Sequence, residues 1–122
     1  MSRVLGIRGA TTADSNTGEA VAEATAEMLD ELVRRNGLKV DDVAAAVFST
    51  TADLDTRYPA SVARLEMGWE YVALMDVQQA DVRGGVPLCI RVLLLVNTDR
   101  APHDLVNVYL RGAAGLREAD QS

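Results

Sequence analysis

The sequence of 122 residues has a single cysteine, no long apolar run and no signal-like apolar segment at its start. A membrane-spanning helix needs about 20 consecutive apolar residues, and no stretch of this chain approaches that length. Cys89 has no second cysteine with which to form an internal disulfide. Met1-Ser2-Arg3 leads directly into a predicted strand, without the apolar region of a secretory signal. These absences predict a soluble, cytoplasmic protein.

Basic charge is also scarce, because the formal net charge is −6 and the isoelectric point lies near 4.6. Nucleic-acid partners require a basic surface that neutralises the phosphate backbone, so we expect no nucleic acid as a partner. The sequence also has no recognisable catalytic triad, metal-ligand cluster or phosphate-binding loop. Any anionic ligand must therefore be bound by a local group of cations.

Arg91 is the one charged residue within residues 88–96, an apolar run with the composition of a β-strand. A guanidinium keeps its proton inside a protein, and an unpaired buried charge is strongly destabilising. This strand should therefore present Arg91 to a carboxylate, a ligand or a solvated cleft. Arg8 stands in the same way near the end of a second apolar segment, residues 4–10. Two arginines projecting from two strands predict a binding site for an anionic small molecule.

The length fits one domain, residues 1–122, with a core of its own. The predicted elements are strands over residues 4–10, 43–49, 69–75, 88–96 and 106–110, a long helix over 16–36, a short helix over 59–65, and a loop over 80–87. A capping pair, Asn16 and Glu19, opens the long helix, and Asn36-Gly37 ends it. This order predicts an α/β or α+β fold in which one long helix covers a mixed five-stranded sheet. The polar residues 112–122 are expected to form a mobile C-terminal tail.

Several short segments together resemble a known family. They are Gly6-Ile7-Arg8-Gly9-Ala10-Thr11-Thr12, Tyr58-Pro59-Ala60 with Arg64 behind it, Cys89-Ile90-Arg91-Val92, Asn97-Thr98-Asp99 and Val108-Tyr109-Leu110. No single segment is specific, but in this order and spacing they resemble the monofunctional, trimeric bacterial chorismate mutases over residues 6–117. The resemblance implies a trimeric pseudo-α/β barrel with three active sites at subunit interfaces and no cofactor. It also implies an isomerase that converts chorismate to prephenate in the shikimate pathway, on the route to phenylalanine and tyrosine.

The chemistry of that reaction fits the residues of this chain. Chorismate carries two carboxylates, and arginines form the charge-assisted, often bidentate hydrogen bonds that such groups favour. The Claisen rearrangement is unimolecular and needs neither a nucleophile nor a proton transfer. An enzyme can hold the flexible enolpyruvyl ether in its compact reactive conformer and stabilise charge as the carbon–oxygen bond breaks. Fixed cations are able to do both.

By this resemblance, Arg91 is the principal catalytic residue, which donates to the ether oxygen as that atom gains negative charge and also reaches a carboxylate. Arg8 would bind a carboxylate, and Tyr109 would add a hydroxyl contact. The other substrate-binding residues that the family pattern implies are Tyr58, Ala60, Arg64, Met75, Leu116 and Arg117. Arg64 would come from the neighbouring subunit, and the last two residues of that set would form a C-terminal flap over the site.

The sequence departs from the family pattern at Gln79, where the family generally has a glutamate that pairs with the key arginine and contacts the ring hydroxyl. Three residues earlier, Asp76 replaces a residue that is often small or sulfur-containing. We hypothesise that Asp76 supplies the missing carboxylate from the other side of the site and balances Arg91, while Gln79 keeps the bond to the hydroxyl. Asp76 would then be catalytic together with Arg91 and Arg8.

Several of these residues have a structural alternative. An aspartate at a strand end, such as Asp76, often caps a turn by bonding nearby backbone amides. Tyr109 on an alternating strand is as often a core residue as a site residue. Arg64 on a short helix is ordinarily solvated. Cys89 is expected to be a small core residue that points to the sheet face opposite to Arg91.

Two other functions stay open at this point. An imine or enamine deaminase on a similar trimeric fold would also bind a carboxylate with an arginine between subunits. The Tyr58-Pro59-Ala60 and Val108-Tyr109-Leu110 segments speak against it. A degenerate mutase that lost catalysis with the change to Gln79 would still bind a prephenate-like ligand.

Overall fold

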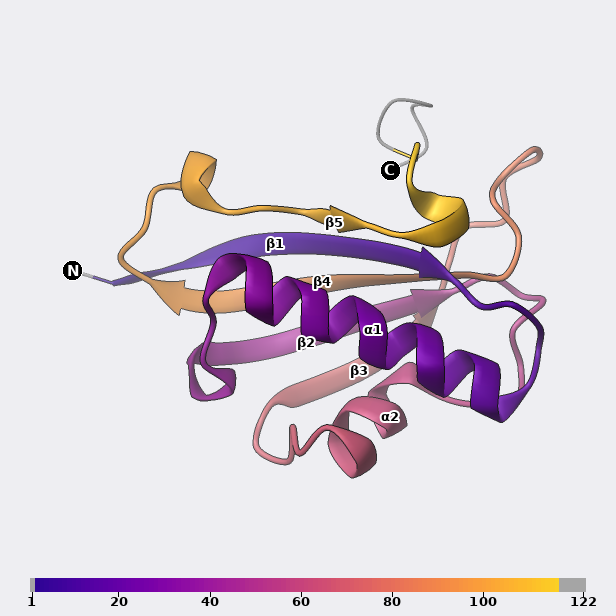
Figure 1. Cartoon of the computed structure of the whole chain (residues 1–122), viewed down its shortest axis with the longest axis horizontal. Helices are drawn as coiled ribbons and strands as arrows, with labels where there is room; N and C mark the ends of the chain where they lie inside the picture. Colours follow the sequence, from indigo (N-terminus) through magenta and orange to yellow (C-terminus); the bar gives the residue numbers. More distant parts are fainter. Residues whose placement is uncertain (1, 117–122) are drawn as a thin grey trace.

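Over residues 2–116, the part of the chain that the structure describes, five strands form one sheet and two α-helices lie against one face of it. Figure 1 shows this arrangement in the computed structural model of the protein. The strands are β1 (Arg3–Thr12), β2 (Val43–Thr50), β3 (Ala73–Gln78), β4 (Cys89–Thr98) and β5 (Val108–Tyr109). The helices are α1 (Gly18–Asn36) and α2 (Pro59–Glu66), with short 3₁₀ turns η1 (Val40–Asp42), η2 (Pro102–Asp104) and η3 (Arg111–Ala113).

The strand order in the sheet is β3-β2-β4-β1-β5. β4 lies in the middle, antiparallel to both β1 and β2, while the edge strands β3 and β5 run parallel to their neighbours. This mixed five-stranded sheet with α1 across it confirms the predicted fold class. Two predicted strand ranges are wrong, because β3 begins only at Ala73 and β5 is shorter than residues 106–110. Trp69, predicted to start β3, is buried in the core from the segment after α2.

Helix α1 begins slightly later than its predicted capping pair. Thr17 is the N-cap, and its Oγ1 accepts a hydrogen bond from the Ala20 N–H at 3.1 Å. Asn16 instead ties the start of the helix to the loop after β2, since its Nδ2 donates to Asp55 Oδ1 at 2.7 Å. The predicted end of the helix is confirmed at Gly37, whose φ of 58° is a left-handed conformation that glycine adopts without a side-chain clash.

The two faces of the sheet are covered very differently. Successive strand residues point to opposite faces, so Ile90 and Val92 of β4 face α1 and are buried in the main core. Helix α1 lies so close to β1 that a Cβ added to Gly9 would meet Leu32 Cδ1 at 2.7 Å. Over the described residues, the opposite face is packed mainly at one end, by the segment after β5. We call this second surface the open face, and four apolar side chains on it are 41% to 58% exposed: Val4, Met75, Val77 and Leu93.

The C-terminal segment is packed as far as the structure describes it. Ala113 and Leu116 are buried together with Cys89 in a small second cluster on the open face. The short helix η3 that contains Ala113 packs against β1. Residues 112–116 are therefore anchored to the sheet rather than loose as predicted, and residues 117–122 lie outside the described part of the chain.

Candidate active site

Three predicted site residues from β1, β4 and β5 come together on the open face. Ala10 of β1 pairs with Arg91 of β4 on one side and with Tyr109 of β5 on the other. Arg8 lies two residues before Ala10 and therefore points to the same face. A cavity of about 260 Å³ is lined by Arg8, Ser49, Arg91, Leu93 and Tyr109 with their neighbours. Strand pairing alone thus gathers two guanidiniums and a phenol around one cavity.

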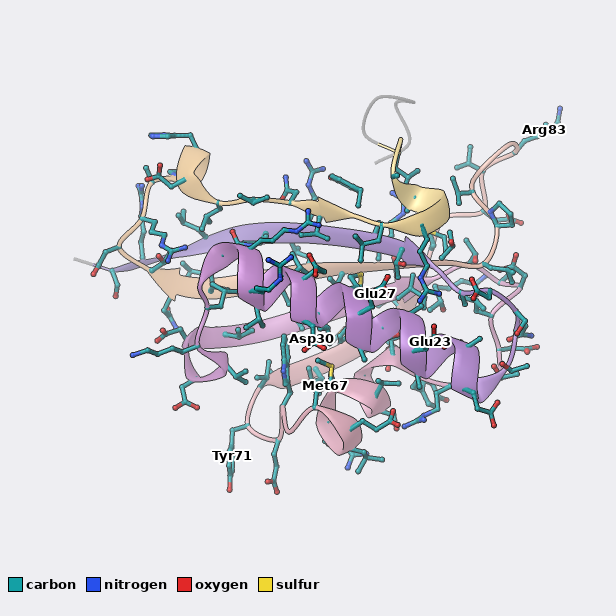
Figure 2. The ribbon with its side chains drawn as sticks, in the orientation of Figure 1. Glu23, Glu27, Asp30, Met67, Tyr71 and Arg83 are labelled. Atoms are coloured by element: carbon teal, nitrogen blue, oxygen red, sulfur yellow. The ribbon has the colours of Figure 1, made fainter. Side chains whose placement is uncertain are left out.

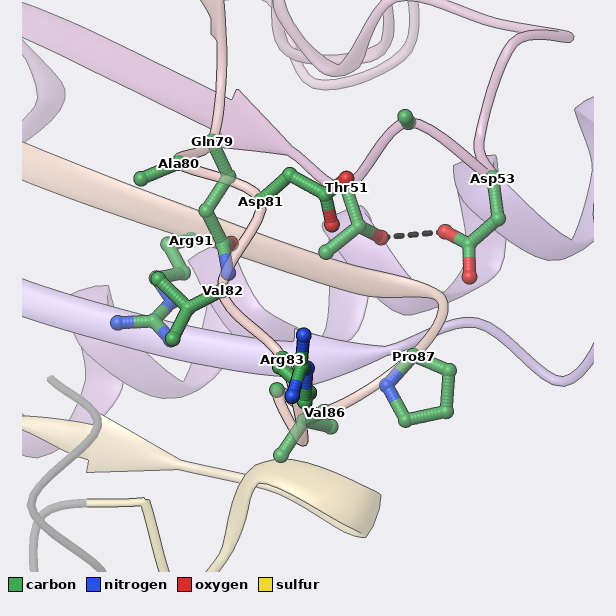
Figure 3. Close-up of a pocket in the computed structure, with 12 residues that line it drawn as sticks. Thr51, Asp53, Gln79, Ala80, Asp81, Val82, Arg83, Val86, Pro87 and Arg91 are labelled. Atoms are coloured by element: carbon green, nitrogen blue, oxygen red, sulfur yellow. Dashed lines mark hydrogen bonds between the residues drawn. The ribbon is translucent and has the colours of Figure 1, made fainter.

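Arg91 also lines a second, larger cavity of about 660 Å³ at the ends of β2 and β4 (Figure 3). Its other walls include Thr51, Asp53, Gln79 and residues 80–87. Gln79 is held there by its backbone N–H, which donates to the Thr50 carbonyl at 2.9 Å. Arg91 therefore stands between the two cavities, and Gln79 lies beside it in the second.

Three buried polar atoms around Arg91 have no hydrogen-bond partner within residues 2–116. They are Arg91 Nε, Gln79 Oε1 and Tyr109 Oη. A buried donor or acceptor without a partner costs free energy, so proteins satisfy nearly all such groups. An oxyanion ligand would accept hydrogen bonds from the guanidinium and the phenol, and a ligand hydroxyl would donate to the Gln79 oxygen. The set of unsatisfied atoms is what a binding site for a hydroxylated anion requires.

Cys89 does not point away from Arg91, so that prediction is wrong. The two residues are two positions apart on β4 and share the open face, where Cys89 packs with Leu116. Burial raises the pKa of the Cys89 thiol, and the Arg91 guanidinium nearby lowers it only in part. The thiol is therefore protonated at neutral pH and belongs to the apolar wall behind the arginine. Leu116 is 2% exposed in that same wall, and Arg117 lies outside the described residues.

Within a single chain Asp76 does not face Arg91, and its pairing with the Arg91 of a neighbouring subunit stays a prediction. Asp76 lies opposite Phe48 in the β2–β3 register, and Phe48 is fully buried on the helix-covered face. Asp76 Oδ1 accepts a hydrogen bond from the Ala60 N–H at 3.0 Å, in the first turn of α2. Burial raises the pKa of the Asp76 carboxyl, and the Ala60 N–H lowers it only in part. The carboxylate thus satisfies a backbone donor that has no partner inside the helix, which is the structural alternative.

The predicted residues around α2 form a separate group. Tyr58 lines a third cavity, of about 480 Å³, together with Asp76 and apart from Arg91. Arg64 is exposed on α2, and Met75 is exposed on the open face of β3. Within a single chain, these residues do not meet Arg91.

Sequence reasoning missed three polar residues that line the Arg91 cavities. Ser49 pairs with Arg91 in the β2–β4 register and lines the smaller cavity. Its one signal is its position as the last residue of a predicted strand. Thr51 and Asp53 line the larger cavity, where the Thr51 hydroxyl donates to an Asp53 oxygen at 2.5 Å. A hydroxyl and an acid in a loop follow no periodic pattern, so only the pairing of β2 with β4 reveals them.

The arrangement can hold an anion and stabilise negative charge, because guanidiniums give strong charge-assisted hydrogen bonds. In the described part of the chain, no group of three or more His, Cys, Asp or Glu side chains is placed to hold a metal ion. The helices over these same residues are not long and apolar enough to cross a membrane.

Known proteins with similar sequence and structure share one description. A family model described as chorismate mutase type I matches residues 4–120. The chorismate mutase AroH of Bacillus subtilis (strain 168) is 38% identical over 114 residues, covering 93% of this chain and 90% of that protein. The chorismate mutase AroH of Thermus thermophilus is 41% identical over 115 residues, covering 93% of each. The solved structure of a chorismate mutase from Clostridium thermocellum superposes with a TM-score of 0.87 at 44% identity, over 89% of this chain and 96% of that one.

Proposed function

The chain belongs to the type I chorismate mutase family, and we propose on that basis that it converts chorismate to prephenate in aromatic amino acid biosynthesis. One observation in the site supports the proposal most directly. Arg91, Gln79 and Tyr109 each present a buried polar atom without a partner in the described chain, and Arg8 adds a second cation. Chorismate has two carboxylates, an ether oxygen and a ring hydroxyl, which are the complementary groups.

Arg91 acts on the ether oxygen of chorismate. In the rearrangement the carbon–oxygen bond breaks while a carbon–carbon bond forms in the same molecule, and the ether oxygen gains negative charge. A guanidinium already fixed beside that oxygen stabilises the charge without reorganising during the reaction. The buried Arg91 Nε is a free donor for this purpose within residues 2–116. The apolar wall of Cys89 and Leu116 keeps the guanidinium in surroundings where its electrostatic effect is larger than in water.

Arg8 and Tyr109 hold the substrate in its compact conformer. Arg8 binds a carboxylate by paired hydrogen bonds, and the Tyr109 hydroxyl contacts an oxygen of the same substrate. Restraint of this kind replaces the search of a flexible molecule for its reactive shape with a geometry fixed on binding. Gln79 accepts from the ring hydroxyl with its free Oε1 and adds no negative charge beside Arg91.

A neighbouring copy completes each site, in a trimer with sites at the subunit interfaces. The separation of Tyr58, Arg64 and Met75 from Arg91 within one chain supports this arrangement. The exposed apolar side chains of the open face support it too, because a second copy packed there would remove them from water. The partner copy would then bring its own Arg64 toward the substrate.

Mixed trimers test the shared site. Arg91→Ala and Arg64→Ala variants should each be nearly inactive alone. When the two are unfolded together and refolded, some interfaces combine an intact Arg91 with an intact Arg64, and turnover should return. If light scattering shows trimers but turnover does not return, the site is not shared. A monomer that turns over chorismate would contradict the trimer itself.

The reaction is tested by the loss of chorismate absorbance and the appearance of prephenate on adding the purified protein. Arg91→Ala, which should fold normally, is the matched control. An imine substrate in a parallel assay addresses the deaminase alternative. Binding of prephenate without any turnover would favour the degenerate mutase and contradict the proposal.

A further inference from the structure

A hydroxyl and a carboxylate in the larger cavity tie the loop after β2 to the start of β4. The Thr51 Oγ1 donates to Asp53 Oδ1 at 2.5 Å (Figure 3). It also accepts a hydrogen bond from the Cys89 N–H at 2.9 Å. Asp53 Oδ2 accepts from the Leu88 N–H at 3.0 Å. The Thr51 N–H donates in turn to the Cys89 carbonyl at 3.1 Å. Both side chains are therefore fully engaged with the backbone at residues 88 and 89.

Leu88 has a backbone conformation that needs such support. Its φ of 50° lies in the left-handed region, where the Cβ of an ordinary residue approaches a carbonyl oxygen. Leucine has no polar side chain that could offset this cost by a local hydrogen bond. The surroundings hold the conformation, with Asp53 accepting from the Leu88 N–H and the Ala13 N–H donating to the Leu88 carbonyl at 2.9 Å. Strain held in this way is concentrated at functional sites.

Leu88 immediately precedes β4, so its backbone conformation sets the direction in which the strand starts. Arg91 is the third residue of β4. Thr51, Asp53 and Arg91 also line the same cavity. The Asp53 carboxylate has an unfavourable charge for a wall near a dianionic substrate. Its position is explained by its bonds to Leu88 and Thr51 rather than by contact with the substrate.

We propose that Asp53, acting with Thr51, is a positioning residue that holds Leu88 left-handed and so aims Arg91 at the substrate. The role rests on the proposed mutase function, because Arg91 is the group that it serves. A misplacement of about 1 Å in a reacting geometry can cost about 10²-fold in rate. Asp53 therefore contributes to turnover without touching the reacting atoms.

Turnover of four variants tests this role. Asp53→Ala and Thr51→Val should lower kcat by up to about 10²-fold. Asp53→Asn keeps one of the two acceptor bonds and should fall between Asp53→Ala and the parent. Thr51→Ser restores the hydroxyl and should recover most of kcat. KM should not rise in proportion in Asp53→Ala, because the loss of a negative charge favours a dianion.

Cys89 provides a second measurement that needs no substrate. It is the one cysteine of the sequence, it is fully buried, and its N–H is part of the tie. A thiol reagent under native conditions should label it at least tenfold faster in Asp53→Ala and Thr51→Val than in the parent. Urea unfolding of each variant separates this local opening from a general loss of stability.

Asp81→Ala is the charge-matched control, since Asp81 lines the same cavity without a described bond to residues 88 and 89. It should leave the labelling rate of Cys89 at the parent value.

Parent-like kcat in both Asp53→Ala and Thr51→Val would overturn the proposal. So would a loss of kcat without faster labelling, because that result indicates a direct contact with the substrate. If Asp53→Ala does not fold, Asp53→Asn and Thr51→Val decide. A parent without mutase turnover would contradict the proposed function, whereas the labelling series would still decide whether the tie holds β4.

Discussion

Arg91 and Arg111 are arginines in neighbouring parts of the fold with opposite surroundings. Arg111, just after β5, contacts three carboxylates at 3.1 to 3.4 Å, those of Asp14, Glu23 and Glu27. Figure 2 shows Glu23 and Glu27 along α1. The hydrogen bond with Glu27 is the main reason that the pKa of Arg111 is raised. Arg91 has a buried Nε with no partner among residues 2–116, and the side chain beside it is the neutral Gln79.

The difference shows that partners, not residue type, separate an anchoring arginine from a ligand-binding one. Three carboxylates outnumber the single charge of Arg111, so an anion would be repelled there. Arg111 instead attaches the segment after β5 to α1, in ion pairs that are each worth about 0.2–1 kcal/mol because their acids are partly exposed. Arg91 keeps its charge available, because no described carboxylate neutralises it.

The largest expected effect comes from removing Arg91, whose Nε has no hydrogen-bond partner among residues 2–116. Arg91→Ala should lower kcat by at least about 10²–10³-fold, because one preorganised donor to the developing oxyanion is lost. Arg91→Lys should also be strongly impaired, since the planar guanidinium fork is absent. A chorismate turnover assay measures the loss of kcat, and urea unfolding checks that each variant is folded. Near-parent turnover in either variant would remove Arg91 from the central role.

The comparison can be reversed by giving Arg91 a carboxylate. Gln79→Glu should raise KM by about tenfold at pH 8, the size of a modest buried ion pair, because the new carboxylate competes with the substrate for the guanidinium. Pairing with Arg91 keeps the pKa of the new carboxyl group at or below the ordinary glutamate value of about 4.3, so KM should stay raised from pH 8 down to pH 5. KM measured over this range tests the prediction, with Gln79→Leu as a neutral control. A parent-like KM in Gln79→Glu at pH 8 would show that residue 79 does not contact Arg91.

Among residues 2–116 the hydrogen bond given for the Asp76 side chain is the one from the Ala60 N–H, so we expect its substitution to affect stability. Asp76→Ala should lose about 0.5–2 kcal/mol, as for a helix cap, because the Ala60 N–H is left unpaired. Asp76→Asn keeps an acceptor and should leave kcat within a few-fold of the parent. A large loss of kcat in Asp76→Asn would restore the catalytic role that the sequence suggested.

The pH dependence of the same residue has a definite sign. The folded-state pKa of Asp76 is raised above its ordinary 3.8, so the folded protein binds the proton more tightly than the unfolded chain. Its contribution to stability is complete below pH 3.8 and is lost as the pH rises through the folded-state pKa. Relative to Asp76→Asn, the parent should therefore become less stable between these values. Urea unfolding at pH 3.5 and pH 7 measures the change, and an opposite slope would contradict it.

The smallest effect is expected at Arg111, which is already paired with three carboxylates. Arg111→Gln should lower stability by about 1 kcal/mol, less at high salt, and should change kcat little. Unfolding at low and high ionic strength, with turnover alongside, measures both. A loss of turnover like that of Arg91→Ala would mean that the two arginines do not have separate roles.

Arg8 and Arg91 could be predicted as a pair because each lies in an apolar segment with strand character, and the family resemblance added Tyr109 to them. The hydrogen bond that Asp76 accepts from the Ala60 N–H depends on tertiary pairing instead. The strand that holds Asp76 alternates, but the face to which Asp76 points depends on its pairing with Phe48, which is remote in sequence. Thr51 and Asp53 were missed because their bonds reach residues 88 and 89, more than thirty positions away.

By itself the sequence determined the class of fold, the end of α1, the family, and Arg8 and Arg91 as candidate anion-binding residues. These depend on residue chemistry and on periodic patterns within a few turns or one strand. The tertiary structure alone decided which polar atoms surround Arg91, that Asp76 caps α2, and that Arg111 is neutralised. Strand register and the side of the sheet that the helices cover are set by packing between distant segments, and a shift of one residue would turn every side chain to the other face.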